Sequence, residues 1–365
     1  MKISRFIALV LGLALILPQG FPQDKQSDYK NKQYTDWAWM YIRGKQKERK
    51  LKKQFSLMKE SGIDGLLILE PRMTDEEFAH VSDPAKKEGL KVHIWIPVTN
   101  PHGERGVEEE HPDWYQVSRE GISCLEKPPY IPSYKWLCPN NPDAHQYLVD
   151  MMQELAKKDY LDGVHLDYIR FPDVILPVGI QPKYDLVQDR EYPEFDFCYC
   201  EHCRKKFKAQ SGIDPMDIED PANNREWVQF RYNSITDLVN DIYDVVHPEG
   251  KMLSAAVFPT PSLAKKLVRQ DWTNWKIDAL MPMIYHEYYY EPLAWIETAA
   301  REGVEGLNGS IPLYSGVFVG WIDADEMDDM VKHSEKAGAN GICLFNANMM
   351  TKKQWKELGK ALNNQ

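Results

Sequence analysis

The sequence predicts a (β/α)8 TIM barrel. Eight apolar runs of strand length occur along the 365 residues, and a helical pattern follows each of them. No glycine-rich phosphate loop follows the first run, which disfavours the main alternative, a doubly wound open sheet. The two longest connections both follow a strand, on the side where barrels carry active sites. A count of eight units further favours a closed barrel.

The predicted elements follow from short apolar runs bounded by polar, Gly or Pro residues. Strands are expected at Asp36–Ile42, Asp64–Glu70, Lys91–Val98, Asp162–Pro172, Lys251–Pro259, Ile277–Tyr285, Ile311–Val319 and Gly341–Asn346. Helices are expected from the basic run at Arg43 to about Gly62, at Thr74–Glu88, from Asn141 onward, at Pro261–Val268, at Pro292–Glu302, at Asp325–Ala337 and at Lys352–Asn363. The long connections at 99–140 and 173–223 are expected to form the walls of a substrate cleft.

The N-terminus resembles a targeting segment. Lys2 and Arg5 precede an apolar run, Phe6–Pro18, that is too short to span a bilayer comfortably. We expect residues 1–22 to be a signal peptide cleaved near Gly20–Gln23, with a retained membrane anchor as the alternative. The remaining residues, 23–365, are then one catalytic domain, exported to the periplasm or the extracellular space, with no later membrane-spanning segment.

Composition excludes some partners. The net charge is −11, and no basic stripe with interleaved aromatic residues is present, so we expect no nucleic-acid binding. The one strongly basic run, Arg43–Lys53, is typical of the solvated face of a helix. The sequence does not indicate an oligomeric state.

The stretch "DGVHLDYIRFP", residues 162–172, places an acid at the end of a buried strand. Side chains alternate along a strand, so His165 and Asp167 share one side, opposite Val164 and Leu166. The apolar pair suits the helix-facing side, which directs His165 and Asp167 toward the barrel axis. Asp167 is then either a catalytic acid at the mouth or the partner of Arg170 in a structural ion pair.

Other acids end predicted strands on the same face. Glu70 ends the second strand, and Glu287 lies just beyond the sixth, in the aromatic segment "MIYHEYYYEP". Asn346 ends the eighth strand, and Asp271 is a weaker candidate because it precedes the sixth strand. A structural role for Glu70 and a solvated loop position for Glu287 are the alternatives.

Aromatic and polar residues near the strand ends are the candidate substrate-binding groups. Flat rings with polar edges stack on sugar faces, although each ring alone is as typical of a core. The set is Trp39, Trp95, Trp136, Tyr285, Tyr288, Tyr289 and Trp321, with His165, Tyr168, Arg170 and Asn346 as polar contacts.

"DGVHLDYIRFP" resembles the signature of the bacterial glycosyl-hydrolase-like family ten. "WLCPNNPDAHQYLVDMMQEL" and "ALMPMIYHEYYY" match as well, and the resemblance covers about 35–347. It implies a (β/α)8 fold and an exported enzyme with glycosidase-like activity on peptidoglycan or other polysaccharides. The chitinase signature is only superficially similar, because His165 replaces its second Asp and Ile169 its catalytic Glu.

Glycoside hydrolysis uses two carboxyl groups that flank the scissile bond. The hypothesis makes Asp167 the nucleophile or base and Glu287 the general acid among aromatic rings, with Glu70 in reserve. No cofactor is required for this chemistry. The alternatives are a glycan-binding barrel without activity and a metal-dependent hydrolase.

Six cysteines are present, three of them in "FCYCEHCRKKF". Cys198, Cys200 and Cys203 are close enough in sequence to bind one structural zinc ion, with His202, Cys124 or Cys138 as a fourth ligand. Disulfides, for example between Cys124 and Cys138, are the alternative in an exported protein. Cys343 is expected to be buried in the eighth strand.

Overall fold

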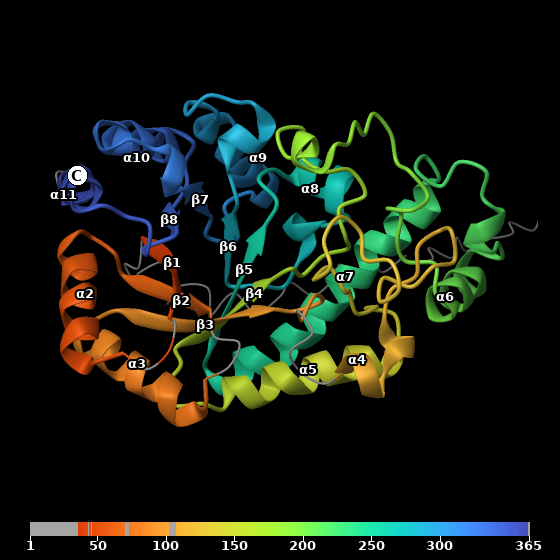
Figure 1. Ribbon diagram of the computed structural model, residues 1–365, viewed down its shortest axis with the longest axis horizontal. Helices are drawn as coiled ribbons and strands as arrows, with labels where there is room; N and C mark the ends of the chain where they lie inside the picture. The colour runs from red at the N-terminus through yellow and green to blue at the C-terminus, as the bar shows by residue number, and fades with distance from the viewer. Residues whose placement is uncertain (1–35, 43, 45, 70–72, 102–106, 364–365) are drawn as a thin grey trace, which may run out of the picture. The chain divides into compact units, whose positions relative to one another are not determined.

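Strands and helices alternate along the chain, and the helices surround a central sheet of parallel strands (Figure 1). The computed structural model describes residues 36–42, 44, 46–69, 73–101 and 107–363. The strands are β1 Trp37–Tyr41, β2 Gly65–Leu69, β3 Lys91–Pro97, β4 Gly163–Asp167, β5 Met252–Val257, β6 Ala279–Pro282, β7 Tyr314–Phe318 and β8 Gly341–Phe345. The helices are α2 Glu48–Glu60, α3 Asp75–Lys87, α4 Val107–Glu110, α5 Pro142–Ala156, α6 Glu201–Ser211, α7 Arg225–Val246, α8 Pro261–Val268, α9 Trp295–Leu307, α10 Met327–Lys336 and α11 Lys352–Asn363.

Short 3-10 helices lie in several connections. They are η1 Pro112–Trp114, η2 Gln181–Tyr184, η3 Pro215–Asp217, η4 His247–Glu249, η5 Trp272–Asn274, η6 His286–Tyr289, η7 Val319–Trp321 and η8 Ala324–Glu326.

The eight strands of the described residues form a nearly closed barrel. Their order is β6-β5-β4-β3-β2-β1-β8-β7, and every pairing is parallel. Two isolated parallel bridges, Leu280 with Leu313 and Met283 with Gly316, join β6 to the β7 region and complete the circle. The predicted (β/α)8 TIM barrel is confirmed.

The elements occur where the sequence predicts them, with shorter strands. β4 ends at Asp167 instead of Pro172, because Tyr168 has a φ of 50° and the left-handed backbone takes the chain out of the sheet. The long connections after β3 and β4 contain two helices that the sequence analysis did not predict, α4 and α6.

Helix starts follow the capping residues in the sequence. Thr74 and Glu77 form a reciprocal capping box at the start of α3. Asn141 accepts hydrogen bonds from the backbone N–H groups of Asp143 and Ala144, and Pro142 occupies the first position of α5. These caps satisfy N–H groups that have no partner within the helix.

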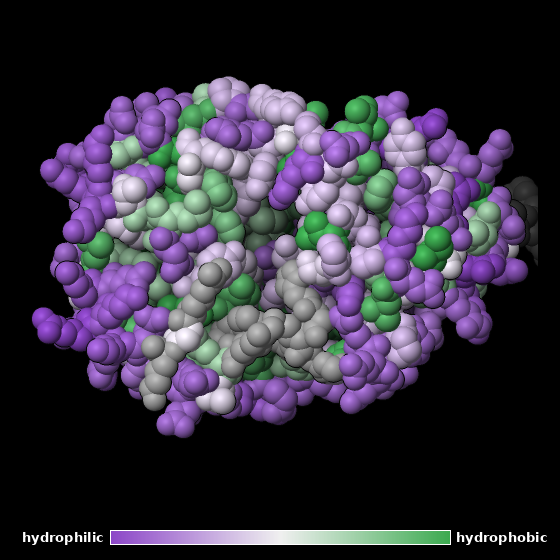
Figure 2. Space-filling view, viewed as in Figure 1, coloured by the Kyte–Doolittle hydropathy of each residue, from purple (hydrophilic) through white to green (hydrophobic). Residues whose placement is uncertain are grey.

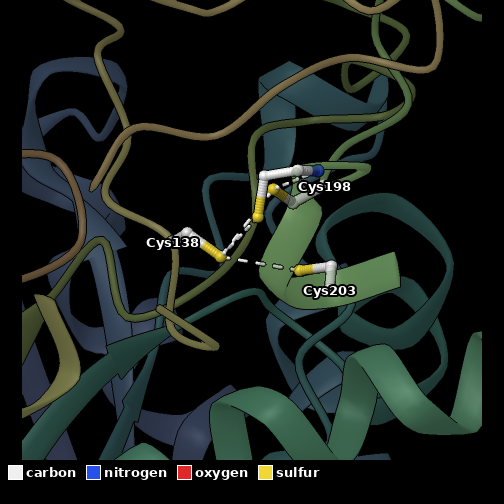
Figure 3. A group of neighbouring side chains, drawn as sticks. Cys138, Cys198 and Cys203 are labelled. Carbon is white, nitrogen blue, oxygen red and sulfur yellow. Dashed lines mark hydrogen bonds between the residues drawn. The ribbon is translucent and has the colours of Figure 1, made fainter. Parts of the chain in front are cut away.

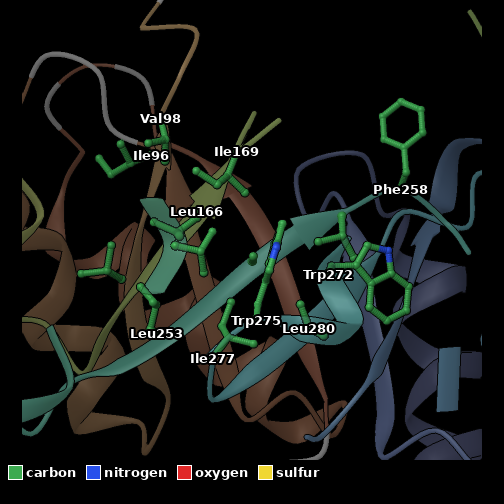
Figure 4. Packing of buried hydrophobic residues seen from close by; sticks show 14 of the residues in the cluster. Ile96, Val98, Leu166, Ile169, Leu253, Phe258, Trp272, Trp275, Ile277 and Leu280 are labelled. Carbon is green, nitrogen blue, oxygen red and sulfur yellow. The ribbon is translucent and has the colours of Figure 1, made fainter. Parts of the chain in front are cut away.

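The apolar core lies between the sheet and the helices. Ile96, Leu166, Leu253 and Leu280, from four successive strands, belong to one cluster of buried apolar residues (Figure 4). Val164 is in the same cluster, so the outward side of β4 is apolar as the alternation predicts.

The inside of the barrel contains a chain of buried polar groups. Trp39 Nε1 donates to His165 Nε2 at 3.0 Å, and His165 Nδ1 lies 2.9 Å from Ser254 Oγ. His93 Nδ1 lies 3.2 Å from the same hydroxyl. Because His165 Nε2 accepts from the indole, its proton belongs on Nδ1, which donates to Ser254. The hydroxyl is then free to donate to His93, and both histidines are neutral.

The predicted signal peptide, residues 1–22, lies outside the described residues. Among the helices of the described part, none has the length and apolar character that crossing a membrane requires.

We predict that Gly163→Ala lowers the free energy of unfolding by about 1–3 kcal/mol. A Cβ at this position would lie 2.5 Å from both His93 Nε2 and the Met252 carbonyl oxygen, so the barrel interior would have to shift. Urea unfolding checks this. The matched control is Gly359→Ala in α11, where the nearest atom lies at 3.4 Å and helix propensity favours Ala by up to about 1 kcal/mol. Equal effects at the two sites would contradict the packing argument.

The buried histidines also predict a pH dependence of stability. Burial lowers the pKa of His93 from 6.5 to about 3, and burial lowers the pKa of His165 well below its usual value. Between about pH 6.5 and 3 the unfolded state therefore binds more protons, and the free energy of unfolding falls as the pH falls. Each group contributes at most about 1.4 kcal/mol per pH unit in this window.

The measurement is urea unfolding between pH 6.5 and 4 for the parent and for His93→Gln. We expect a slope that is shallower by about 1.4 kcal/mol per pH unit in the variant, which has one fewer group that takes up a proton on unfolding. His80→Gln, at an exposed position, controls for the substitution itself. Identical slopes for the parent and His93→Gln would show that His93 does not stay neutral in the folded state.

Candidate active site

Asp167 lies at the C-terminal end of β4 and is 8% exposed. Its Oδ2 accepts a hydrogen bond from Trp95 Nε1 at 2.9 Å, and its Oδ1 accepts one from the backbone N–H of Tyr168 at 2.7 Å. Hydrogen bonds from N–H groups to a carboxylate stabilise its negative charge and fix its orientation. Asp167 is therefore an oriented carboxylate at the barrel mouth, on the inward side that alternation predicts.

The turn after Asp167 is tied to β3. The Thr99 hydroxyl donates to the carbonyl oxygens of Tyr168 and Arg170, the latter at 2.9 Å. Val98 donates its backbone N–H to the carbonyl of Asp167 at 2.8 Å. These bonds hold the left-handed conformation of Tyr168, which directs the chain into the long connection.

The ion pair between Asp167 and Arg170, considered as the alternative to a catalytic role for Asp167, is not formed. Arg170 Nη1 pairs instead with Asp173 Oδ2 at 2.8 Å, and both side chains are buried. The guanidinium also lies 4.8 Å from the ring centroid of Trp136 and 5.0 Å from that of Phe258. Arg170 anchors the loop after β4, and it does not neutralise Asp167.

Aromatic rings surround the mouth of the barrel. Trp95 lies 5.2 Å from Tyr41 and 6.0 Å from Phe345, between ring centroids, and Phe345 lies 5.5 Å from Tyr285. The face in Figure 2 is hollowed near its middle, in the region where the strands converge in Figure 1. The sequence analysis missed Tyr41 and Phe345. Tyr41 lies two residues after Trp39 and so shares its side of β1, and Phe345 is the last residue of β8, so strand alternation could have identified both.

Tyr285 has an unusual hydroxyl. It is buried and has no hydrogen-bond partner among the described residues. Burial raises the pKa of Tyr285 well above its usual value, and the nearby charge of Asp167 adds to this rise. The hydroxyl therefore stays protonated and available as a donor beside Asp167.

Three predicted substrate-binding residues lie inside the protein. Trp39, His165 and Trp136 are each at most 1% exposed, and Trp39 and His165 bond each other inside the barrel. A sugar would have to displace surrounding residues to reach them. We therefore correct their expected role to support of the site. Trp95, Tyr168, Tyr285 and Asn346 lie at the mouth, as predicted from their positions at strand ends.

Asn346 borders a pocket beside β1 and β8. Its Oδ1 accepts from the backbone N–H of Asn348, whose side chain bonds the backbone of Tyr41. These residues line a pocket of about 490 Å³. The pocket therefore lies between the ends of β1 and β8 and the start of α2, with Lys50 and Gln54 on its helical side.

The three other acids considered as catalytic candidates, Glu287, Glu70 and Asp271, do not lie in the settings expected for them or lie outside the described residues. Glu287 lies in η6 and is exposed, so the enclosing aromatic environment expected for it is not found. Glu70 lies outside the described residues. Asp271 forms an ion pair with Lys265 at 2.9 Å, so its carboxylate already has a charged partner.

The cysteines separate into a cluster and two single residues. The Sγ atoms of Cys138, Cys198, Cys200 and Cys203 all lie within 4.8 Å of one another. Of the three fourth ligands considered, Cys138 is the one brought into place. Cys124 accepts a hydrogen bond from the backbone N–H of Trp136 instead, and the structure forms no disulfide between it and Cys138.

The chain is similar in fold to solved glycoside hydrolases. The glycoside hydrolase domain of PgaB (BpsB) from Bordetella bronchiseptica aligns with a TM-score of 0.66 and 12% identity, over 90% of this chain and 98% of that one. The catalytic domain of β-amylase from Paenibacillus polymyxa aligns with a TM-score of 0.62 and 11% identity, over 90% and 98%. The β-galactosidase from Rahnella sp. R3 aligns with a TM-score of 0.63 and 12% identity, over 91% of this chain and 56% of that one.

At these identities the structural likeness shows a shared fold. A comparison with curated proteins found no significant match. A family model described as glycosyl hydrolase-like 10 matches residues 69–334, which is more than half of the sequence and includes β4 and the long connections. The chain therefore belongs to the glycosyl hydrolase-like 10 family.

Proposed function

We propose that this protein is an exported glycoside hydrolase that cleaves glycosidic bonds in a polysaccharide or in the glycan of peptidoglycan. The observation that carries the proposal is Asp167, an oriented carboxylate at the mouth of a barrel whose family is glycosyl hydrolase-like. The apolar run at residues 6–18 supports export.

The proposed reaction uses Asp167 as the nucleophile or the base. Its two hydrogen bonds hold the carboxylate in place, which suits attack on a sugar carbon or activation of a water molecule. Glu287 is the proposed general acid, with Glu70 in reserve. Because Glu287 is exposed, it would approach the leaving oxygen from the open side of the mouth. The chemistry needs no cofactor.

The mouth offers the contacts that a sugar requires. Tyr41, Trp95 and Phe345 offer rings for stacking, and Tyr285 has a buried hydroxyl without a partner among the described residues. Because this hydroxyl is buried, neighbouring side chains would have to move aside before a sugar hydroxyl accepts from Tyr285 and satisfies this donor. Burying the Tyr285 hydroxyl without a partner costs free energy in the substrate-free protein. A hydrogen bond to bound substrate would offset this cost.

A glycan-binding barrel without activity is the second candidate. It is favoured by one observation: within the described residues, the buried acid that follows Asp167 on the connection after β4, Asp173, is held in an ion pair with Arg170. A hydrolase whose activity depends on a metal bound by the cysteines is disfavoured, because four thiolates would fill a tetrahedral shell and leave no position for water.

We predict that Asp167→Asn and Glu287→Gln each lower kcat by at least about 100-fold. The measurement is release of reducing ends from a panel of polysaccharides and purified peptidoglycan, with folding checked by circular dichroism. Asp328→Asn, an exposed acid on α10, is the matched control and should retain full activity.

Two results would contradict this assignment. Near-parental rates in both folded variants would remove Asp167 and Glu287 from the mechanism. Binding of a glycan by the parent, without new reducing ends on any member of the panel, would favour the glycan-binding barrel.

Tyr285→Phe provides a second test, with opposite effects on stability and on substrate binding. Removing a buried hydroxyl without a partner should leave the free energy of unfolding unchanged or raised by up to about 1 kcal/mol. Loss of the donor should raise KM by about 5- to 10-fold. Tyr115→Phe is the matched control, because its hydroxyl is also buried without a partner but its electrostatic neighbours are Glu108, Cys124 and Tyr147. An unchanged KM in Tyr285→Phe would show that this hydroxyl does not contact substrate.

A further inference from the structure

Four cysteines from two distant segments meet outside the barrel mouth. Cys138 lies at the end of the connection between β3 and α5, and the other three lie just before and within the first turn of α6. Figure 3 shows Cys138 facing Cys198 and Cys203 across the gap between the two segments. Nothing in the proposed hydrolytic chemistry uses these side chains.

The spacing of the sulfur atoms fits a metal ion better than disulfides. Cys138 Sγ lies 3.5 Å from the Sγ atoms of Cys200 and Cys203, and 3.8 Å from that of Cys198. Four sulfurs at about 2.3 Å from a zinc ion are separated by about 3.8 Å along the edges of a tetrahedron. A disulfide would need about 2.05 Å between one pair of them. One sulfur here faces three others at nearly equal distance, which is the arrangement of a shared central ion.

The surroundings of the sulfurs suit negatively charged thiolates. Cys198 Sγ accepts from the backbone N–H groups of Val117 at 3.4 Å and Cys200 at 3.5 Å, and Cys203 Sγ accepts from Asn140 Nδ2 at 3.3 Å. Such donors orient metal ligands and offset their charge. Cys200 is also the N-cap of α6, where the helix dipole favours negative charge.

The side chain of Asn140 links the cluster to a cation. Its Oδ1 accepts from Lys206 Nζ at 3.0 Å, while its Nδ2 donates to Cys203 and to Ser234 Oγ at 2.8 Å. A zinc ion with four thiolates carries a net charge of −2, so a nearby ammonium group reduces the cost of burying it.

We propose that Cys138, Cys198, Cys200 and Cys203 bind one structural Zn²⁺ ion that joins the connection after β3 to the connection after β4. Four buried sulfur ligands close the coordination shell, so the ion has a structural role. Trp136, two residues before Cys138, stacks on Arg170 in the loop that leaves β4. The ion therefore stabilises both walls of the mouth at a point away from Asp167.

The first test is the metal content of the full-length protein, purified without chelator and measured by inductively coupled plasma mass spectrometry. We expect one zinc per chain. Cys138→Ser and Cys203→Ser should each retain less than about 0.1 zinc per chain, because three remaining thiolates bind far more weakly. The matched controls are Cys124→Ser and Cys343→Ser, which remove buried cysteines outside the cluster and should keep one zinc.

The second test reads the ligands directly and does not depend on how the variants fold. Replacement of the metal of the parent protein by Co²⁺ should give the visible absorption of a tetrahedral cobalt thiolate site. Thiol titration in denaturant with chelator should count six free thiols. Iron in place of zinc, a disulfide among the four cysteines by mass spectrometry, or equal zinc in Cys138→Ser and Cys124→Ser would each overturn the proposal. None of these readouts requires glycosidase activity.

Discussion

The inside of the barrel is the constraint on which the rest of the structure depends. A closed barrel must fill its axis with side chains, and every polar atom placed there must find a partner away from water. Trp39, His165, Ser254 and His93 meet both requirements through one chain of hydrogen bonds from β1 to β4, β5 and β3. This chain fixes the register of β4, and the position of Asp167 two residues beyond His165 follows from that register.

The mouth is built from the ends of the barrel strands and from the long connections that follow β3 and β4. Asp167 and Trp95 lie on neighbouring strands and bond each other, so the proposed nucleophile belongs to the most constrained part of the fold. The connections after β3 and β4 are anchored separately, by the Arg170–Asp173 ion pair and by the four cysteines. A buried ion pair adds little net stability compared with apolar packing, but breaking it leaves a costly unpaired charge. Its role here is to select one path for the loop.

The sequence was sufficient to predict the barrel fold and the inward position of Asp167, because both follow from local periodicity. Eight apolar runs give the strand count, and alternation along 163–167 places His165 and Asp167 inside. The partner of Arg170 could not be predicted in the same way, because Asp167 and Asp173 are both three residues away from it. The left-handed turn at Tyr168 decides between them, and no sequence rule requires a tyrosine to adopt it.

Long-range partners also escaped the sequence analysis. Cys138 is separated from Cys198 by 60 residues, so spacing alone could not choose it over Cys124 or His202. The same holds for the burial of Trp136, which depends on Arg170 approaching from another loop. Composition identifies the residue types of such sites, whereas the folded loops decide which residues meet.

The position of the second acid depends on these loops as well. Gly179, in the connection after β4, donates its backbone N–H to the carbonyl of Tyr288 at 2.8 Å. A Cβ on Gly179 would lie 2.6 Å from the carbonyl oxygen of Glu287, so the two segments fit only because this residue is a glycine. The backbone that carries Glu287 is therefore held by the same connection that carries the three cysteines of the α6 region. In this arrangement Asp167 is set by the barrel interior, while Glu287, the proposed general acid, is set by a loop. For the proposed pair, the distance between the two carboxyl groups, which separates a retaining from an inverting mechanism, then depends on how the loops are anchored.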